Sequence, residues 1–268
     1  MTKTLCASAL PLLALSLSPA HAGLSVDSAA FSYSQSFDSL TTNTVAVPWL
    51  NDSTLPGWSL FTSTLGDAAT IAADTGTSNA GTFRSYGGSG SGDRALGGTA
   101  SGGAYFGSPP TGAIAGWIAV AFTNNTGAAL DGFTLNYSGE QWRNGGNASA
   151  QSMVLEFGLG ASFGTVGTWA APGGAFSWTS PVTGATAAAV DGNTAGLVGG
   201  LGGTVSGLDW TNGQTLWLRW VERNDTGNDH GLAIDDLSLT VTAVPEPSAW
   251  ALMLAGLAAV GFVARRRG

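Results

Sequence analysis

Three glutamates are the residues of this sequence best suited to acid–base chemistry. Glu140, Glu156 and Glu222 lie on stretches predicted to be strands, and glycoside hydrolysis needs two carboxylates about 5–10 Å apart. Glu140 is followed by Trp142 and Arg143, which suits an acid beside a sugar-stacking ring and equally a salt bridge at a strand end. No nucleophile elbow, phosphate loop or His-Glu-x-x-His pattern is present. The sequence therefore predicts a protein that is not an enzyme, with a glycan-acting hydrolase or lyase as the weaker alternative.

Aspartates in the last part of the body could bind a cation. Asp225 and Asp229 lie in a polar loop, and Asp235 and Asp236 are adjacent on the strand that follows. Calcium takes six to eight oxygen ligands, but adjacent strand residues face opposite ways, so only one of the pair can face a given site. The alternative is an ordinary turn in which these aspartates are solvated and bind no metal. His230 cannot build a zinc site by itself.

Tryptophans are the other candidates for a binding role. Trp217 and Trp220 lie three apart on one predicted strand, so they face opposite sides, one in the core and one semi-exposed. Trp142 and Trp169 are surrounded by Gly, Asn and Ala and are the best candidates for platforms that stack on a sugar. For any of these rings, filling the core is the alternative, because Trp buries a large apolar area.

The elements that must position these residues are predicted to be short strands. Short apolar alternations bounded by Gly, Asn and Asp are typical of a sandwich or barrel. We predict strands at about 31–37, 58–62, 70–73, 94–97, 105–106, 114–124, 130–141, 152–158, 205–208, 215–222 and 232–242.

Two connections affect the arrangement of these strands. Asn124-Asn125-Thr126-Gly127 is typical of a hairpin turn, which predicts that 114–124 and 130–141 are antiparallel neighbours. The Gly- and Ser-rich stretch 85–103 is predicted to be a long loop within one sandwich, with a linker between two domains as the alternative. The stretch 170–203 is predicted to be loop with one or two short edge strands.

Charge and cysteine usage narrow the function. Between Gly23 and Val244 there are five basic and sixteen acidic residues and no lysine. That balance excludes nucleic acid as a partner, because phosphates require a basic face, and it permits calcium and hydrated polysaccharide. Cys6 is the sole cysteine, so stability must come from an apolar core, with or without a bound metal, rather than from disulfides.

The first 22 residues predict export. Lys3 precedes an apolar segment, and Ala20-His21-Ala22 supplies the small-x-small pattern that signal peptidase cleaves. We therefore divide the chain into a signal peptide at 1–22, a β-sandwich body at 23–243 and a C-terminal segment at 244–268.

The C-terminal segment has three parts. Pro245-Glu246-Pro247 comes first, then an uncharged stretch from Trp250 to Ala264, then Arg265-Arg266-Arg267. As a helix, the uncharged stretch is about 22 Å long, which makes a short transmembrane helix whose arginines stay on the cytoplasmic side as a stop.

This order of features resembles the PEP-CTERM sorting signal of Gram-negative bacteria. The resemblance implies processing by exosortase, a membrane cysteine transpeptidase that cuts near the motif. The protein would cross the inner membrane, be anchored there transiently, and reach the cell surface or the extracellular matrix beside exopolysaccharide. A tail anchor that is never cut is the alternative.

The two ends of the body carry a second resemblance. Residues 35–40 and 55–58, with Ala233-Ile234-Asp235-Asp236-Leu237 near the end, look like the terminal strands of jelly-roll modules such as carbohydrate-binding, MAM and laminin-G-like domains. The resemblance implies a jelly-roll-like antiparallel β-sandwich whose terminal strands lie side by side. It also implies one structural Ca²⁺ between them, held by Asp38 with Asp235 or Asp236. The function expected is thus that of a non-enzymatic exported surface protein, with a carbohydrate-binding module using a tryptophan platform as the alternative.

Overall fold

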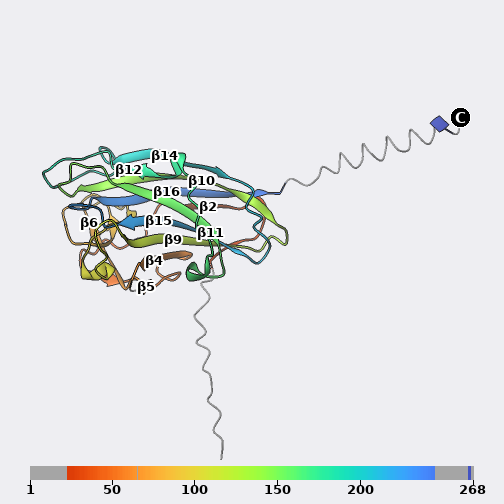
Figure 1. The fold of residues 1–268 in the computed structure, drawn as a ribbon, viewed down its shortest axis with the longest axis horizontal. Coiled ribbons are helices and arrows are strands. Elements are labelled where there is room, and N and C mark those ends of the chain that lie inside the picture. Colours follow the sequence, from red (N-terminus) through yellow and green to blue (C-terminus); the bar gives the residue numbers. More distant parts are fainter. Residues whose placement is uncertain (1–22, 65, 245–264, 267–268) are drawn as a thin grey trace, which may run out of the picture.

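The computed structural model describes residues 23–64, 66–244 and 265–266. Within these ranges the chain is almost entirely strand and loop, and its long strands run along the longest direction of the molecule (Figure 1). The predicted signal peptide and the predicted helix 250–264 lie outside the described residues.

The strands form two sheets. In the first sheet the order is β12 (Trp178–Thr179), β11 (Ser152–Leu159), β15 (Thr215–Arg223), β9 (Ile114–Asn124), β4 (Trp58–Thr62) and β5 (Gly66–Asp67), and β1 (Leu24–Val26) lies parallel to β9. In the second sheet the order is β13 (Ala188–Ala189), β10 (Leu130–Asn144), β16 (Gly231–Ala243), β8 (Ala95–Thr99), β7 (Thr82–Tyr86), β6 (Thr70–Asp74) and β3 (Val47–Pro48). Two more strands join the second sheet: β14 (Leu197–Val205) pairs with β10, and β2 (Ser32–Gln35) pairs with β16.

One apolar core lies between the sheets. On β15 the side chains of Leu216, Leu218 and Trp220 enter it, because alternate residues of a strand face the same side. Phe133 of β10 enters it from the second sheet, and Trp220 stacks on Trp58 at 5.9 Å between ring centroids. The protein is therefore all-β with two packed sheets, consistent with the predicted β-sandwich.

The predicted hairpin between 114–124 and 130–141 is wrong. Strand β9 pairs with β15 and β4 in the first sheet, whereas β10 pairs with β14 and β16 in the second. The turn itself forms, with Asn124 Oδ1 accepting from the amide of Thr126 at 3.0 Å. Both edges of each strand are already occupied, so the turn carries the chain from one sheet to the other.

Glycine-rich segments account for the other corrections. The strand predicted at 94–97 is confirmed as β8, but the loop predicted around it, 85–103, also contains the end of β7. The predicted strand 105–106 belongs instead to a 3₁₀ helix, η1 (Ala104–Phe106). Strand β14 occupies Leu197–Val205 rather than the predicted 205–208. Its Gly-rich sequence has no alternating pattern, so only pairing with β10 defines it as a strand.

The prediction that the terminal strands lie side by side is confirmed. Strand β2 pairs antiparallel with β16, with Gln35 opposite Leu237. The pairing of β16 with β10 shifts register next to Asp236, whose φ of 49° is a left-handed conformation. This β-bulge turns Asp236 outward while Leu237 returns to the core.

Candidate functional site

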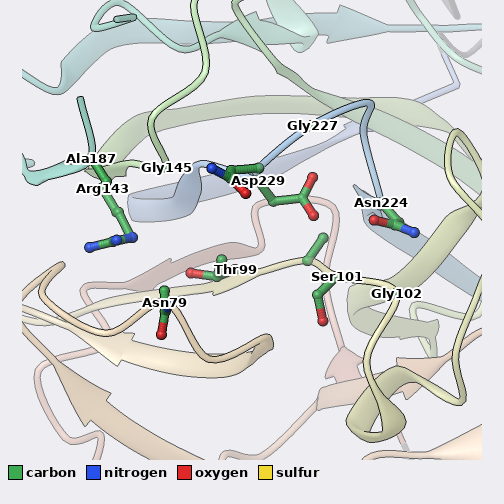
Figure 2. Close-up of a pocket in the computed structure, with 12 residues that line it drawn as sticks. Asn79, Thr99, Ser101, Gly102, Arg143, Gly145, Ala187, Asn224, Gly227 and Asp229 are labelled. Atoms are coloured by element: carbon green, nitrogen blue, oxygen red, sulfur yellow. The ribbon is translucent and has the colours of Figure 1, made fainter. Parts of the chain in front are cut away.

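A polar pocket of about 280 Å³ lies at one end of the sandwich. It lies where the ends of β8 and β10 meet the loop that joins β15 to β16. Thr99 and Ser101 line one wall, Arg143 lies at the end of β10, and Asn224 and Asp229 come from the loop. Figure 2 shows Asp229 between Arg143 and Asn224, with Thr99 and Ser101 on the other side of the hollow.

Hydrogen bonds fix the loop that carries Asn224 and Asp229. Asp229 Oδ1 accepts from the amide of Asp225 at 2.8 Å, and Asn224 Nδ2 donates to the carbonyl of Pro109 at 2.9 Å. Asn147 Nδ2 donates to the carbonyls of Thr226 and Asn228, at 2.8 and 3.0 Å. The pocket is thus preformed rather than dependent on loose loop side chains.

The other walls are held in place as well. Arg143 Nη1 donates to the carbonyls of Gly76 and Thr77, at 3.0 and 3.1 Å. The hydroxyl of Thr99 is paired with that of Tyr86 at 2.7 Å. Arg143 lines the pocket and forms no ion pair among the described residues, and its guanidinium is held by these two carbonyls.

Buried acids surround this pocket. Burial raises the pKa of Asp229 to about 7, and the nearby charge of Asp225 acts in the same direction. Glu222 points from β15 into the interior, and an atom added to Gly98 beside the pocket would lie 3.2 Å from its Oε1. Burial, together with the charges of Asp229 and Asp225, raises the pKa of Glu222 to about 8.

Two buried polar atoms near the pocket have no hydrogen-bond partner among the described residues. One is Glu222 Oε1 and the other is His230 Nε2. His230 Nδ1 accepts from the amide of Gly145, so the neutral ring carries its proton on Nε2. Leaving a buried polar group unpaired costs free energy, so each such group needs an explanation, and a ligand is one of them. The sequence singled out Asp229 and His230, but not their convergence with Arg143 and Thr99.

The glutamates considered for acid–base chemistry are not brought together. Glu156 pairs with Arg219 on the outer face of the first sheet at 2.5 Å. Glu140 Oε2 accepts from Trp142 Nε1 at 2.8 Å on the outer face of the second sheet. Glu222 lies in the interior. The suggested salt bridge between Glu140 and Arg143 is absent from the ion pairs of the described chain.

Trp142 is not an exposed platform. Only 3% of it is exposed, its ring stacks parallel to Tyr86 at 6.1 Å, and an atom added to Gly192 would lie 2.4 Å from the indole. The glycine that allows this contact is distant in the sequence: because Gly192 has no side chain, its backbone can pack against the ring.

Trp169 belongs to an aromatic cluster on the outer face of the first sheet. The cluster forms around Phe163 of η2 (Phe163–Thr165), which stacks on Phe61 at 4.0 Å. The guanidinium carbon of Arg219 lies 3.8 Å above the ring of Trp169. Trp217 faces this cluster and is fully buried, so the predicted opposite faces of Trp217 and Trp220 are confirmed, but neither ring is semi-exposed.

Asp38, Asp235 and Asp236, the aspartates predicted to hold calcium, have different surroundings in the structure. Asp38 Oδ1 accepts from the amide of Arg94 at 3.0 Å, and Asp235 is buried whereas Asp236 is exposed. In the part of the chain that the structure describes, no three His, Cys, Asp or Glu side chains form a group that could hold a metal ion. The difference between the two neighbouring carboxylates comes from the β-bulge at Asp236, which interrupts the strand alternation on which the prediction relied.

The sorting segment begins where β16 ends. Pro245, Glu246, Pro247 and Arg267 lie outside the described residues, and Arg265 and Arg266 are exposed. Across 23–64, 66–244 and 265–266, no helix is both long and apolar enough to span a bilayer.

The structure thus defines an all-β protein with a polar pocket at one end of its sandwich. Comparison with known proteins bears on its C-terminal segment. Residues 243–267 match the model of the PEP-CTERM protein-sorting motif. No curated protein matches the chain. The motif suggests an exported protein that exosortase sorts to the cell surface, and it covers only the last part of the sequence.

Proposed function

We propose that this chain is a non-catalytic surface protein, exported as a precursor and released from its tail by exosortase. The observation that carries the proposal is the sorting motif at 243–267. Its first residue, Ala243, is also the last residue of β16, where it pairs with Leu130. The folded body thus ends where the sorting segment begins.

The strand that leads to the motif also separates it from the pocket. Strand β16 begins at Gly231, beside the pocket loop, and ends at Ala243. At about 3.3 Å per residue, thirteen residues span about 40 Å. The pocket and the start of the sorting segment therefore lie at opposite ends of β16.

The absence of catalysis is supported by the positions of the glutamates. Glu140 lies on the outer face of the second sheet and Glu156 on the outer face of the first sheet. Glu222 lies in the interior. No two of these three are placed as the acid pair that glycoside hydrolysis needs.

The mass of the native protein tests the sorting proposal. We expect the protein recovered from its host to begin near Gly23 and to end near Pro245–Pro247. Replacing Pro245, Glu246 and Pro247 by alanine should leave the tail attached and the precursor in the membrane fraction. A strain without exosortase provides the matched control and should give the same precursor. Recovery of the intact, uncut chain from the cytoplasm would rule out the proposal.

Calcium and polysaccharide association are finer proposals for the same protein. A calcium ion completed by backbone carbonyls around Asp38 and Asp235 would raise the melting temperature, because a ligand bound only to the native state stabilises it. Equal melting temperatures with calcium and with chelator would exclude it. For polysaccharide, the partly exposed Trp169 is the remaining tryptophan candidate, and its ring is already covered on one face by Arg219.

A further inference from the structure

We propose that the polar pocket at the end of the sandwich binds a small, neutral, polyhydroxylated ligand such as one sugar unit. Neither Trp142 nor Trp169, the tryptophans considered as platforms, lines this pocket, although Arg143 follows Trp142 in the chain. The proposal does not depend on the sorting tail.

The lining supplies both donors and acceptors. Thr99 and Ser101 carry hydroxyls that do both, and Asn224 and Asn228 carry amides that do both. Arg143 adds a guanidinium with several N–H donors. A ligand covered with hydroxyls, each a donor and an acceptor, matches such a set, whereas an apolar ligand would leave these groups unpaired.

The charges around the pocket favour a neutral ligand over an ion. One cation, Arg143, and one acid, Asp229, both line the pocket, so a charged ligand would be attracted by one and repelled by the other. The chain has seventeen acidic and nine basic residues, so its net negative charge would also repel an anion. A metal ion is disfavoured because no three ligand side chains converge in the described chain.

The size and construction of the pocket suit one sugar unit. A volume of about 280 Å³ lies just below the usual range for sites of drug-sized ligands. Arg143, Asn224 and Asp229 are each at least nine-tenths buried and held by hydrogen bonds. Their polar atoms need not be reoriented when a ligand binds, which lowers the entropic cost of recognition.

A titration of the full-length chain tests this inference. The chain is purified in a detergent without a sugar headgroup and titrated with neutral methyl hexopyranosides, followed by isothermal calorimetry. We expect saturable binding with a dissociation constant of about 1 mM for at least one of them, as suits a ligand of this size. Glucuronate, a charged analogue, should bind at least about tenfold more weakly.

Two variants assign the binding to the pocket. Ala187 is exposed and lines the pocket, so Ala187→Leu should fill it and weaken binding at least about tenfold. Ala185 is exposed and does not line the pocket, so Ala185→Leu should bind like the unmodified chain. Asp229→Asn keeps an oxygen for the amide of Asp225 and should weaken binding without lowering the melting temperature.

Three results would overturn the inference. They are the absence of saturable binding by every neutral sugar, stronger binding of glucuronate than of its neutral counterpart, and equal affinities for the Ala187→Leu and Ala185→Leu variants. Because the titration needs no exosortase, none of these results bears on the sorting proposal.

Discussion

The guanidinium carbon of Arg219 lies 3.8 Å above the ring of Trp169, while Arg219 Nη2 lies 2.5 Å from Glu156 Oε2. The same guanidinium thus joins a strand of the first sheet to the loop that covers its outer face. The side chains of Arg219 and Glu156 are 11% and 23% exposed, so water screens this pair less than it would a surface salt bridge.

We expect Arg219 and Glu156 to be energetically coupled. In a double-mutant cycle of Arg219→Gln and Glu156→Gln, the coupling free energy of unfolding should be about 1–3 kcal/mol. Chemical denaturation of the four proteins measures it. Arg219→Lys should not restore stability, because an ammonium lacks the planar surface that stacks on Trp169. Substitution of the exposed Arg223 provides the control and should show no coupling to Glu156→Gln. If the effects of the substitutions at 219 and 156 on the free energy of unfolding are additive, the pair is not coupled.

Glu222 should make the protein less stable as pH rises. Burial raises its pKa from 4.5 to about 8, so the folded state keeps a proton that the unfolded state has lost. The free energy of unfolding should therefore fall between about pH 4.5 and pH 8, by at most about 1.4 kcal/mol per pH unit from this group.

Glu222→Gln should reduce that dependence. Glutamine stays neutral, so the loss of stability between pH 5 and pH 8.5 should be smaller in the variant, whatever constant offset the new amide introduces. Urea denaturation across this range measures the change. Asp67→Asn, at an exposed position, is the control and should leave the slope as it was. An identical slope in the Glu222→Gln variant would contradict the burial of an uncharged carboxyl.

Gly139→Ala should destabilise the core. A methyl group there would lie 2.5 Å from the ring of Trp178, which is 3% exposed, and overpacking of this kind costs about 1–3 kcal/mol. Gly199→Ala places its methyl with nothing within 4 Å and should change stability little. Thermal or chemical unfolding of both variants tests the difference, and equal stabilities would mean that Trp178 does not pack against Gly139.

The sequence predicted most of the strands because their apolar residues alternate. Trp58–Thr62 and Ile114–Asn124 were placed with the bounds that the structure has. Strand β14 was misplaced because its glycines give no pattern, and it exists only through its pairing with β10. The hairpin was mispredicted for a different reason: a turn sequence fixes local backbone geometry, not the sheet to which each flanking strand belongs.

By itself the sequence determined the sorting motif and the sheet-rich character of the body, because both depend on the order of residues along the chain. Only the tertiary structure decided that Trp142 is buried and that Arg143, Asn224 and Asp229 meet around one pocket. Arg143 ends β10 and Asp229 precedes β16, so the pairing of these two strands, with Arg143 opposite Gly231, brings them together, whereas Asn224 follows β15 of the other sheet. Burial and the convergence of distant side chains depend on strand pairing and on the packing of the two sheets, and no local pattern encodes them.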